Sequence, residues 1–365
     1  MELFLSPRLR IFFSADIVGS TSLKQQGNLI DKERIEPLWA SVIQGFYIES
    51  YNSFKNEWKS RKEKCTKKLQ ACLYGEDPYF WKSIGDEVLF TKLITDYRQV
   101  SSIILCWIEV ISELRKFVQK SSPSLNIKCS AWLAEFPIKN KEVVIGNGVN
   151  ISNHVESYII ENGDLINKIL SDPETVNSRI DYVGPSIDTG FRVSSRASSR
   201  KMAISVDVAY IISITMPINE KEKIPIFFSG SEPLKGVLKE APYPNFWIDM
   251  SDYNSLFKKE DQLLSTPACS RDAVKEYCET FFEEYKNYIF RPFIYKDKTN
   301  TISNPPDGYN EKLITIQKEY RKFKRQTSEK YSEHKSLERG KGMTEEKFNE
   351  KKANTIEFIN KKIDN

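Results

Sequence analysis

Apolar runs in the first 140 residues predict four β-strands. Residues 9–15, Leu-Arg-Ile-Phe-Phe-Ser-Ala, have the continuous apolar pattern of a buried strand. Residues 79–82 and 87–91 flank a Gly-Asp turn, which predicts a β-hairpin. Residues 125–136 alternate in part between apolar and polar positions, and Pro137 ends this strand.

Two long stretches between these strands predict amphipathic helices, because apolar residues recur at spacings of three and four. They cover residues 32–62 and 97–118. Later in the chain we expect a helix from Pro185 and another over residues 273–289, with strands at residues 202–206, 227–228, 234–237 and 245–250. Strands and helices alternate with hairpins rather than strict βαβ repeats, so we predict an α+β fold with helices on one face of the sheet.

Length and charge suggest a main domain followed by an accessory segment. The chain of 365 residues is long for a single ordinary core. We expect a main domain over residues 1–250 and a helical, charged C-terminal extension over residues 251–365, with a polar linker near residues 297–308. The chain from residue 311 holds 15 Lys/Arg against 10 Asp/Glu, whereas the preceding part holds 39 against 40. Such a mixed-charge run is usually a solvated helix, although lysine-rich tails also attract nucleic acid or anionic membranes.

The composition argues against a membrane protein and against a zinc protein. No apolar run approaches the roughly 20 residues of a membrane span, and the first residues lack a signal-peptide pattern. The six cysteines form no Cys-x-x-Cys pair, and the chain has only two histidines. We therefore expect a cytoplasmic protein with reduced thiols, and no stable complex with nucleic acid or membrane.

Two aspartates stand where a predicted strand gives way to a turn. Asp16 lies in Phe-Ser-Ala-Asp-Ile-Val-Gly-Ser-Thr, and Asp86 lies in Lys-Ser-Ile-Gly-Asp-Glu-Val-Leu-Phe. Carboxylates on neighbouring strands suit Mg²⁺, which prefers oxygen ligands and substrate phosphates. The Gly-Ser-Thr turn can open a helix whose backbone N–H groups attract anions. These features predict a nucleotide-phosphate site, although Asp16 could also be a helix cap and Gly85-Asp86 a simple turn.

The two motifs, in this order and about seventy residues apart, resemble the metal-aspartate motifs of class III nucleotidyl cyclases. In that family a ferredoxin-like domain dimerises head to tail, and each active site takes its aspartates from one protomer and its transition-state residues from the other. The resemblance implies a homodimer with active sites at the subunit interface and two Mg²⁺ or Mn²⁺ ions per site. It assigns the ions to Asp16, Asp86 and the carbonyl of Ile17, and phosphate oxygens to Gly19, Ser20 and Thr21.

A later segment, which runs from Asp181 to Arg192, falls where adenylate cyclases carry Asp-x-x-Gly-x-x-x-Asn-x-x-x-Arg. Arg192 takes the position of the transition-state arginine, whereas Asp188 replaces the usual asparagine. Lys82 and Asp181 fall at the positions that read adenine in adenylate cyclases, and taken alone they imply ATP. The simpler interpretation of Arg192 is an ion pair with Asp188, four residues earlier on one helix.

A narrower resemblance implies a pyrimidine substrate. Four strings are similar to the bacterial Pycsar pyrimidine cyclases: Gly-Pro-Ser-Ile-Asp-Thr-Gly-Phe-Arg, Ala-Trp-Leu-Ala-Glu-Phe-Pro, Leu-Lys-Gly-Val and Tyr-Pro-Asn-Phe-Trp-Ile-Asp-Met. The resemblance implies conversion of UTP to cyclic UMP, or of CTP to cyclic CMP, as a signal in antiphage defence that activates a separate effector. Bulky residues of the first long helix would close the pocket around a single-ring base, and the candidates are Phe46, Tyr47 and Tyr51.

Three other readings of the sequence stay open. Lys82 and Asp181 favour an adenylate cyclase, and Asp188 in place of asparagine favours an inactive nucleotide-binding module. A basic tail that binds nucleic acid is the third. Arg196, Arg200 and Lys201 are candidates for the triphosphate tail, and each is equally typical of an ordinary surface cation.

Overall fold

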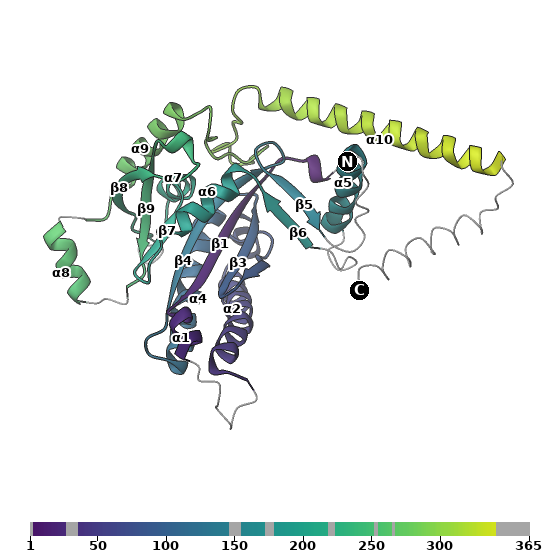
Figure 1. Ribbon diagram of the computed structural model, residues 1–365. Helices are drawn as coiled ribbons and strands as arrows, with labels where there is room; N and C mark the ends of the chain where they lie inside the picture. The colour runs from purple at the N-terminus through teal and green to yellow at the C-terminus, as the bar shows by residue number, and fades with distance from the viewer. Residues whose placement is uncertain are drawn as a thin grey trace.

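A computed structural model describes residues 3–26, 36–145, 155–171, 179–217, 223–251, 255–264 and 267–340. Within these residues a seven-stranded sheet has the order β2-β3-β1-β4-β7-β9-β8, and β5 and β6 pair as a separate two-stranded sheet (Figure 1). The strands are β1 (Arg8–Val18), β2 (Tyr79–Ile84), β3 (Glu87–Ile94), β4 (Asn126–Phe136), β5 (Lys141–Ile145), β6 (Arg179–Val183), β7 (Lys201–Ile204), β8 (Phe227–Pro233) and β9 (Pro242–Asp249).

The described helices connect these strands and follow the last of them. They are α1 (Ser20–Gln26), α2 (Leu38–Glu63), α3 (Lys67–Leu73), α4 (Arg98–Ser121), α5 (Val155–Ser171), α6 (Pro185–Ser194), α7 (Val206–Ile214), α8 (Ser255–Leu264), α9 (Arg271–Glu284) and α10 (Tyr309–Gly340). None of them combines the length and the apolar character that a membrane crossing requires.

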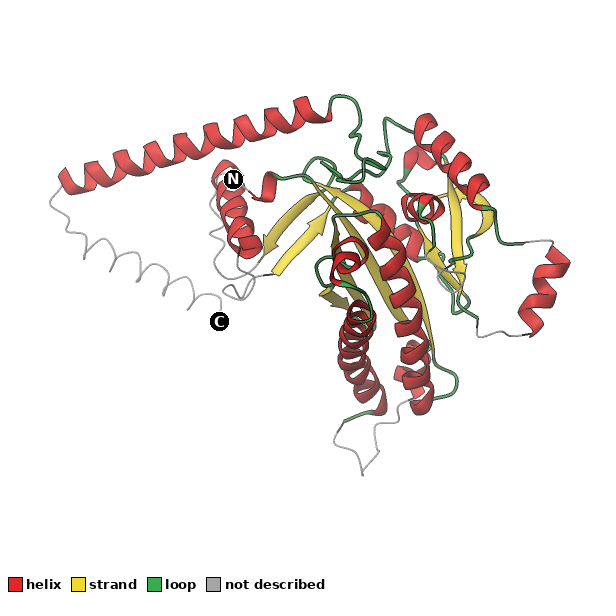
Figure 2. Cartoon of the chain, turned by 180° about the vertical axis from the view of Figure 1, so that it is seen from behind, coloured by secondary structure: helices red, strands yellow, loops and turns green. Residues whose placement is uncertain are grey.

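The first four strands have the ferredoxin-like β-α-β-β-α-β arrangement, which confirms the predicted α+β class. β1 is antiparallel to both β3 and β4, and β3 is antiparallel to β2. α2 leads from β1 to β2, and α4 leads from β3 to β4. Both helices lie on the same face of the sheet (Figure 2) and bury a large core there, in which Phe13, Phe54 and Trp107 are in ring contact.

The other face of the sheet is also covered in part, which corrects the expectation of helices on one face only. α6 packs Ile187 and Phe191 on a second apolar cluster that contains Phe12 and Trp132. Neighbouring β1 residues are therefore buried on opposite faces of the sheet. Phe12 packs in the cluster under α6 and Phe13 in the large core, and each is 0% exposed. The continuous apolar run of this strand reflects burial on two faces.

Several predicted elements differ from the observed ones. The helix expected over residues 32–62 begins at Leu38, because Pro37 is extended with ψ of 145°; residues 27–35 lie outside the described part. The strand expected at residues 234–237 is wrong: this segment is a turn in which Gly236 has φ of 76°. The strand expected over residues 202–206 ends at Ile204, and α7 starts two residues later.

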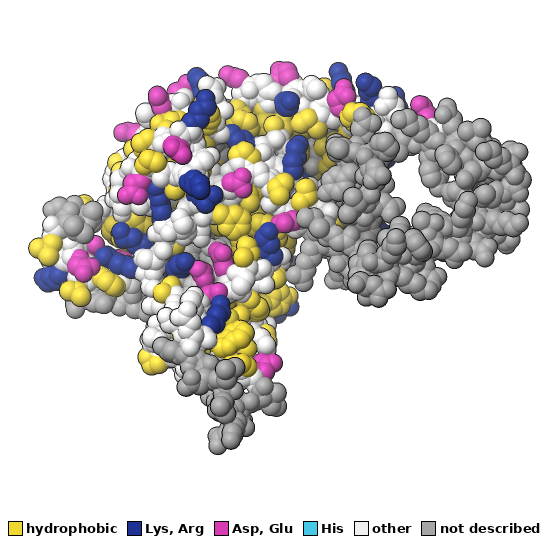
Figure 3. Space-filling model, in the orientation of Figure 1, with side chains coloured by type: hydrophobic (Ala, Val, Ile, Leu, Met, Phe, Trp, Pro, Cys, Tyr) yellow, Lys and Arg dark blue, Asp and Glu magenta, His cyan; other side chains and the backbone are white. Residues whose placement is uncertain are grey.

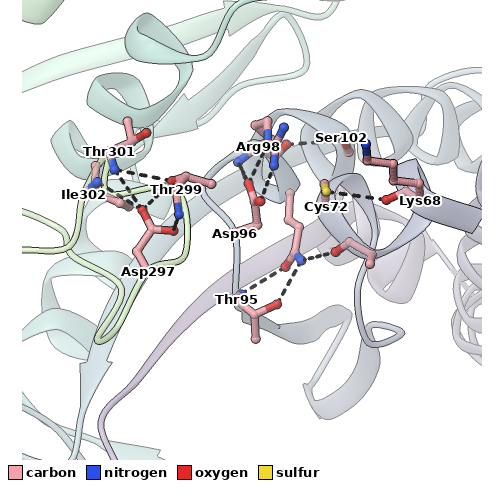
Figure 4. A network of polar contacts seen from close by, with 12 residues as sticks. Lys68, Cys72, Thr95, Asp96, Arg98, Ser102, Asp297, Thr299, Thr301 and Ile302 are labelled. Carbon is pink, nitrogen blue, oxygen red and sulfur yellow. Dashed lines mark hydrogen bonds and ion pairs between the residues drawn. The ribbon is translucent and has the colours of Figure 1, made fainter.

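α9 joins the C-terminal part of the chain to the core of the fold. α9 packs on α7, and its residues Val274, Cys278 and Phe282 belong to the large core. The predicted linker near residues 297–308 is not helical, and Asp297 accepts hydrogen bonds from the backbone N–H groups of Thr299, Thr301 and Ile302 (Figure 4). The division at residue 250 stays a prediction, since α9 lies beyond it yet shares the core of the preceding residues.

Candidate active site

The two motif aspartates meet at one end of the sheet. Asp16, near the end of β1, lies opposite Glu87 in the antiparallel register with β3. Asp86 occupies the tight turn between β2 and β3, and its carbonyl accepts a hydrogen bond from the backbone N–H of Ile17 at 3.4 Å. Because side chains alternate along a strand, Asp16 faces the same side as Phe12, which is the side that α6 covers.

Each aspartate forms an ion pair with a lysine. Lys128 Nζ lies 2.8 Å from Asp16 Oδ2, and Lys24 Nζ lies 3.0 Å from Asp86 Oδ1. Burial favours a higher pKa for Asp86, but hydrogen bonds from Ser20 and Lys24 outweigh it and keep the pKa below its ordinary value. Acidic and basic side chains lie next to one another on this face (Figure 3).

Neither lysine was a sequence candidate. Lys128 pairs with Asp16 across β1 and β4, so only the strand register reveals it. Lys24 lies one helical turn after Ser20 on α1, and the pattern of the motif gives no reason to single it out. In this structure each of the two aspartate carboxylates therefore forms an ion pair with a lysine ammonium group.

A third acid stands beside the aspartates. Glu87 follows Asp86 directly, and burial raises its pKa despite the nearby Ser14 hydroxyl, which favours the charged form. Among the described residues, no group of three or more His, Cys, Asp and Glu side chains is arranged to hold a metal ion. A divalent ion would rely on Asp16 and Asp86, because carboxylate oxygens are the ligands that a hard cation prefers. Both carboxylates already attract positive charge, since each binds a lysine ammonium group.

The Gly-Ser-Thr turn adjoins these carboxylates. Gly19 directly follows β1 and has φ of 91°, a backbone conformation that residues other than glycine rarely adopt. Ser20 begins α1, and its hydroxyl donates to the second carboxylate oxygen of Asp86. Thr21 is exposed. In this structure the Ser20 hydroxyl therefore hydrogen-bonds to Asp86, and its expected contact with phosphate stays a prediction.

Lys82 and Asp181 lie together, although 99 residues separate them in the chain. Lys82 Nζ on β2 is 2.9 Å from Asp181 Oδ1 on β6, and Trp81 Nε1 donates to the same oxygen at 3.0 Å. Their side chains are 33% and 31% exposed, so this pair can reach a ligand.

Tyr47 contacts the turn that carries Asp86, because its hydroxyl donates to the carbonyl of Gly85. It also lines an open cavity of about 1020 Å³, together with Tyr51 and Tyr79. The third candidate of this helix, Phe46, is 0% exposed. It lies in the large core between the sheet and the helices α2 and α4, on the face of the sheet that α6 does not cover. Phe46 was therefore a wrong candidate for a pocket wall.

α6 presents Asp188 and Arg192 to solvent. No ion pair joins these two side chains, and the Arg192 guanidinium contacts no polar partner among the residues that the structure describes. Gly190, between them, lies on Trp132 so closely that a Cβ there would approach the indole ring to 2.3 Å. The helix is thus held against the sheet while its arginine stays available.

The neighbouring cations have structural partners. Arg196 donates to the carbonyls of Tyr243 and Glu232. Arg200 pairs with Asp249 at 3.2 Å and also contacts Asp261 at 2.5 Å. Arg196 ties the segment after α6 to β8 and β9, and Arg200 joins the start of β7 to β9 and α8, so the candidate role of holding a triphosphate is not supported for them.

No family model and no curated protein matches the chain. Among solved structures, it is similar to the adenylyl cyclase CyaB from P. aeruginosa, with 13% identity, a TM-score of 0.43, and coverage of 68% of this chain and 97% of that one. It is also similar to the guanylate cyclase domain of RhGC from Catenaria anguillulae in complex with GTP, with 14% identity, a TM-score of 0.39 and coverage of 67% and 97%.

A rhodopsin-guanylyl cyclase catalytic core with converted specificity, in complex with ATPαS, gives 15% identity, a TM-score of 0.40 and coverage of 67% and 96%. These similar structures are cyclase domains, the family that the two aspartate motifs resemble. With TM-scores below 0.5, they do not assign this chain to a family or give it a substrate.

Proposed function

We propose that this chain is a homodimeric nucleotidyl cyclase that converts UTP to 3′,5′-cyclic UMP and pyrophosphate. The observation that carries the proposal is the meeting of Asp16 and Asp86 at one end of the sheet, each with a cation on its carboxylate. Two Mg²⁺ or Mn²⁺ ions would take the places of the ammonium groups, with the Ile17 carbonyl as a further ligand. When bound, such ions stabilise the attacking and leaving oxygens of an in-line displacement.

Arg192 supplies the second part of the proposal. In the reaction the ribose 3′-oxygen bonds to the α-phosphorus, the bond to pyrophosphate breaks, and the 3′-hydroxyl proton is released. Negative charge grows on the phosphoryl oxygens, and a guanidinium in reach contributes on the order of 10³ to 10⁵ in rate. Arg192 is exposed on α6, which suits a residue that acts in the active site of the partner subunit.

The choice of base rests on Tyr47, Lys82 and Asp181. Tyr47 is tied to the aspartate turn and lines the cavity beside it, so it is well situated to restrict the pocket to a single-ring base. The juxtaposition of Lys82 and Asp181 instead favours ATP, and an adenylate cyclase is therefore the second candidate function. Cytidylate cyclase activity is the variant of the first candidate in which CTP replaces UTP.

The experiment that tests the proposal is a product assay with the purified full-length chain. UTP, CTP, ATP and GTP are each supplied with Mg²⁺ or Mn²⁺, and cyclic products are identified by mass spectrometry. We expect cyclic UMP from UTP, no product from Asp16→Ala or Asp86→Ala, and a loss of about 10³-fold or more from Arg192→Ala.

Two matched variants control for the loss of a charge. Glu63→Ala and Arg321→Ala each remove an exposed charge from a helix away from the site, and both should keep full activity. Product from CTP alone would replace UTP by CTP, and product from ATP alone would favour the second candidate. Nucleotide binding without any cyclic product would identify an inactive binding module and contradict the enzyme.

The proposed biological role follows from the resemblance of the sequence to pyrimidine cyclases. The cyclic nucleotide would be made after phage infection and would activate a separate effector protein. Cells that carry the wild-type chain should accumulate the cyclic nucleotide on infection, whereas cells with Asp86→Ala should not. Constant nucleotide levels in both strains would contradict this role without affecting the assignment of the reaction.

A further inference from the structure

Three serine hydroxyls meet between the sheet and the last turn of α6. Ser14 Oγ on β1 lies 2.9 Å from Ser130 Oγ on β4 and 3.2 Å from Ser194 Oγ, at the end of α6. Ser14 and Ser130 face each other in the strand register and are 1% and 0% exposed. We call Ser14, Ser130 and Ser194 the serine cluster. None of the three was a candidate from the sequence.

Ser14 is the centre of this cluster, because its hydroxyl lies within hydrogen-bond distance of both other hydroxyls. A serine hydroxyl has one proton to donate and two lone pairs that accept. Ser14 can therefore donate to one of its two neighbours, Ser130 and Ser194, and accept from the other. One buried side chain of β1 thus joins this strand to both β4 and α6.

We propose that the serine cluster positions Arg192 for the cyclase reaction, an inference that rests on the proposed function. Arg192 lies two residues before Ser194, and its guanidinium has no polar partner in the described part of the chain. Its location therefore depends on how the last turn of α6 sits on the sheet.

The last turn of α6 is also held by the buried Val193 and, just beyond it, by Arg196, which donates to the carbonyls of Tyr243 and Glu232. Ile187 and Phe191 hold the helix by apolar packing, which is not directional. Hydrogen bonds depend strongly on angle, so the bond between Ser194 and Ser14 adds a directional restraint on the rotation and height of the helix end. The three serines act through the helix rather than on the nucleotide, and they are positioning residues.

Mixed dimers provide the test, because the arginine of one subunit serves the aspartates of the other. A dimer of one Asp86→Ala subunit and one Arg192→Ala subunit retains a single complete site. Its arginine comes from the Asp86→Ala subunit. Ser194→Ala is then added to either subunit, with the two subunits carrying different affinity tags so that only mixed dimers are assayed.

We expect kcat to fall about fivefold when Ser194→Ala is in the arginine-donating subunit, the loss that one hydrogen bond of about 1 kcal/mol produces. KM should stay within about twofold, and Ser194→Thr, which keeps the hydroxyl, should restore the rate. In the other subunit Ser194→Ala should have no effect. Ser171→Ala, which removes a hydroxyl bonded within α5, should have no effect in either subunit.

Equal losses from both placements would indicate general destabilisation and overturn the proposal, and so would no loss from either. A parent mixed dimer without activity would instead contradict the shared active site of the proposed function. In that case hydrogen–deuterium exchange of the wild-type homodimer decides the anchoring separately. Faster exchange of residues 190–195 in Ser194→Ala supports it, and unchanged exchange overturns it.

Discussion

The side chain of Lys92, on β3, is fully buried although lysine is normally charged. Its ammonium group donates to the Leu93 carbonyl at 2.7 Å and to Gln99 Oε1 at 3.0 Å, and it lies 5.6 Å from the centre of the Trp58 ring. No carboxylate is within ion-pair distance among the described residues. Burial therefore lowers the pKa of Lys92 to about 7.

This burial predicts a stability that rises with pH. Between about 7 and the ordinary lysine pKa of 10.5, Lys92 is protonated in the unfolded chain and neutral in the folded one. The unfolded chain binds more protons in this window, so the free energy of unfolding increases as pH rises through it. We expect an increase of a few kcal/mol, on the order of 1.4 kcal/mol per unit of pKa shift.

Lys92→Met isolates this contribution, because methionine keeps a similar length without a titratable group. Denaturant unfolding at pH 7 and pH 9.5 should show a smaller pH-dependent gain for the variant than for the wild type. Lys59→Met, at an exposed position of α2, should behave as the wild type. Parallel curves for Lys92→Met and the wild type would show that Lys92 is charged in the folded protein.

At the scale of single elements, α6 depends on one glycine. The ring of Trp132 is buried between Phe12 and Phe191, so it cannot move aside for a Cβ at position 190. Gly190 thus sets the distance between helix and sheet, and with it the position of the helix end that carries Arg192.

Gly190→Ala should therefore lower both stability and activity. Overpacking of this kind costs about 1–3 kcal/mol, which thermal unfolding measures, and displacement of α6 should reduce kcat more than it changes KM. Thr189→Ala, at the neighbouring position, should change neither by a comparable amount. Because Trp132→Phe makes room, the double variant should regain part of the stability, and failure to do so would contradict this packing argument.

At the scale of the whole molecule, α10 reaches back across the chain to segments far from it in sequence (Figures 1 and 2). Tyr309 donates to the buried carboxylate of Glu135, and Leu313 is 5% exposed. Farther along, the Tyr320 ring contacts Phe4 at 4.8 Å and its hydroxyl donates to Asp164 at 3.1 Å. The first part of α10 is therefore part of the packed structure.

Two truncations separate this part of α10 from the rest of the tail. A chain that ends at residue 308 should be less stable than the wild type, because each buried side chain contributes about 1.5–3 kcal/mol and Glu135 loses a partner. A chain that ends at residue 326 should keep the wild-type melting temperature and activity. Equal stability of both truncated chains would show that the contacts of Tyr309, Leu313 and Tyr320 are dispensable.

Local features of this protein can be predicted from its sequence. Apolar spacing of three and four residues gave α4 almost its full extent, and the Gly-Asp turn gave the hairpin of β2 and β3, since both depend on neighbours in the chain. The motifs around Asp16 and Asp86 likewise pointed to an acidic site. That these aspartates bind metal, and that Arg192 acts in the reaction, stays a prediction from the resemblance.

What covers the second face of the sheet, and which groups surround the aspartates, became clear only from the packing of the folded chain. Lys128 reaches Asp16 through the register of β4, and Ser194 reaches Ser14 across 180 residues. Phe46 and Tyr47 are adjacent in sequence, yet one is buried in the core and the other lines the cavity. Such choices depend on how separate elements pack, and no local pattern of residues contains that information.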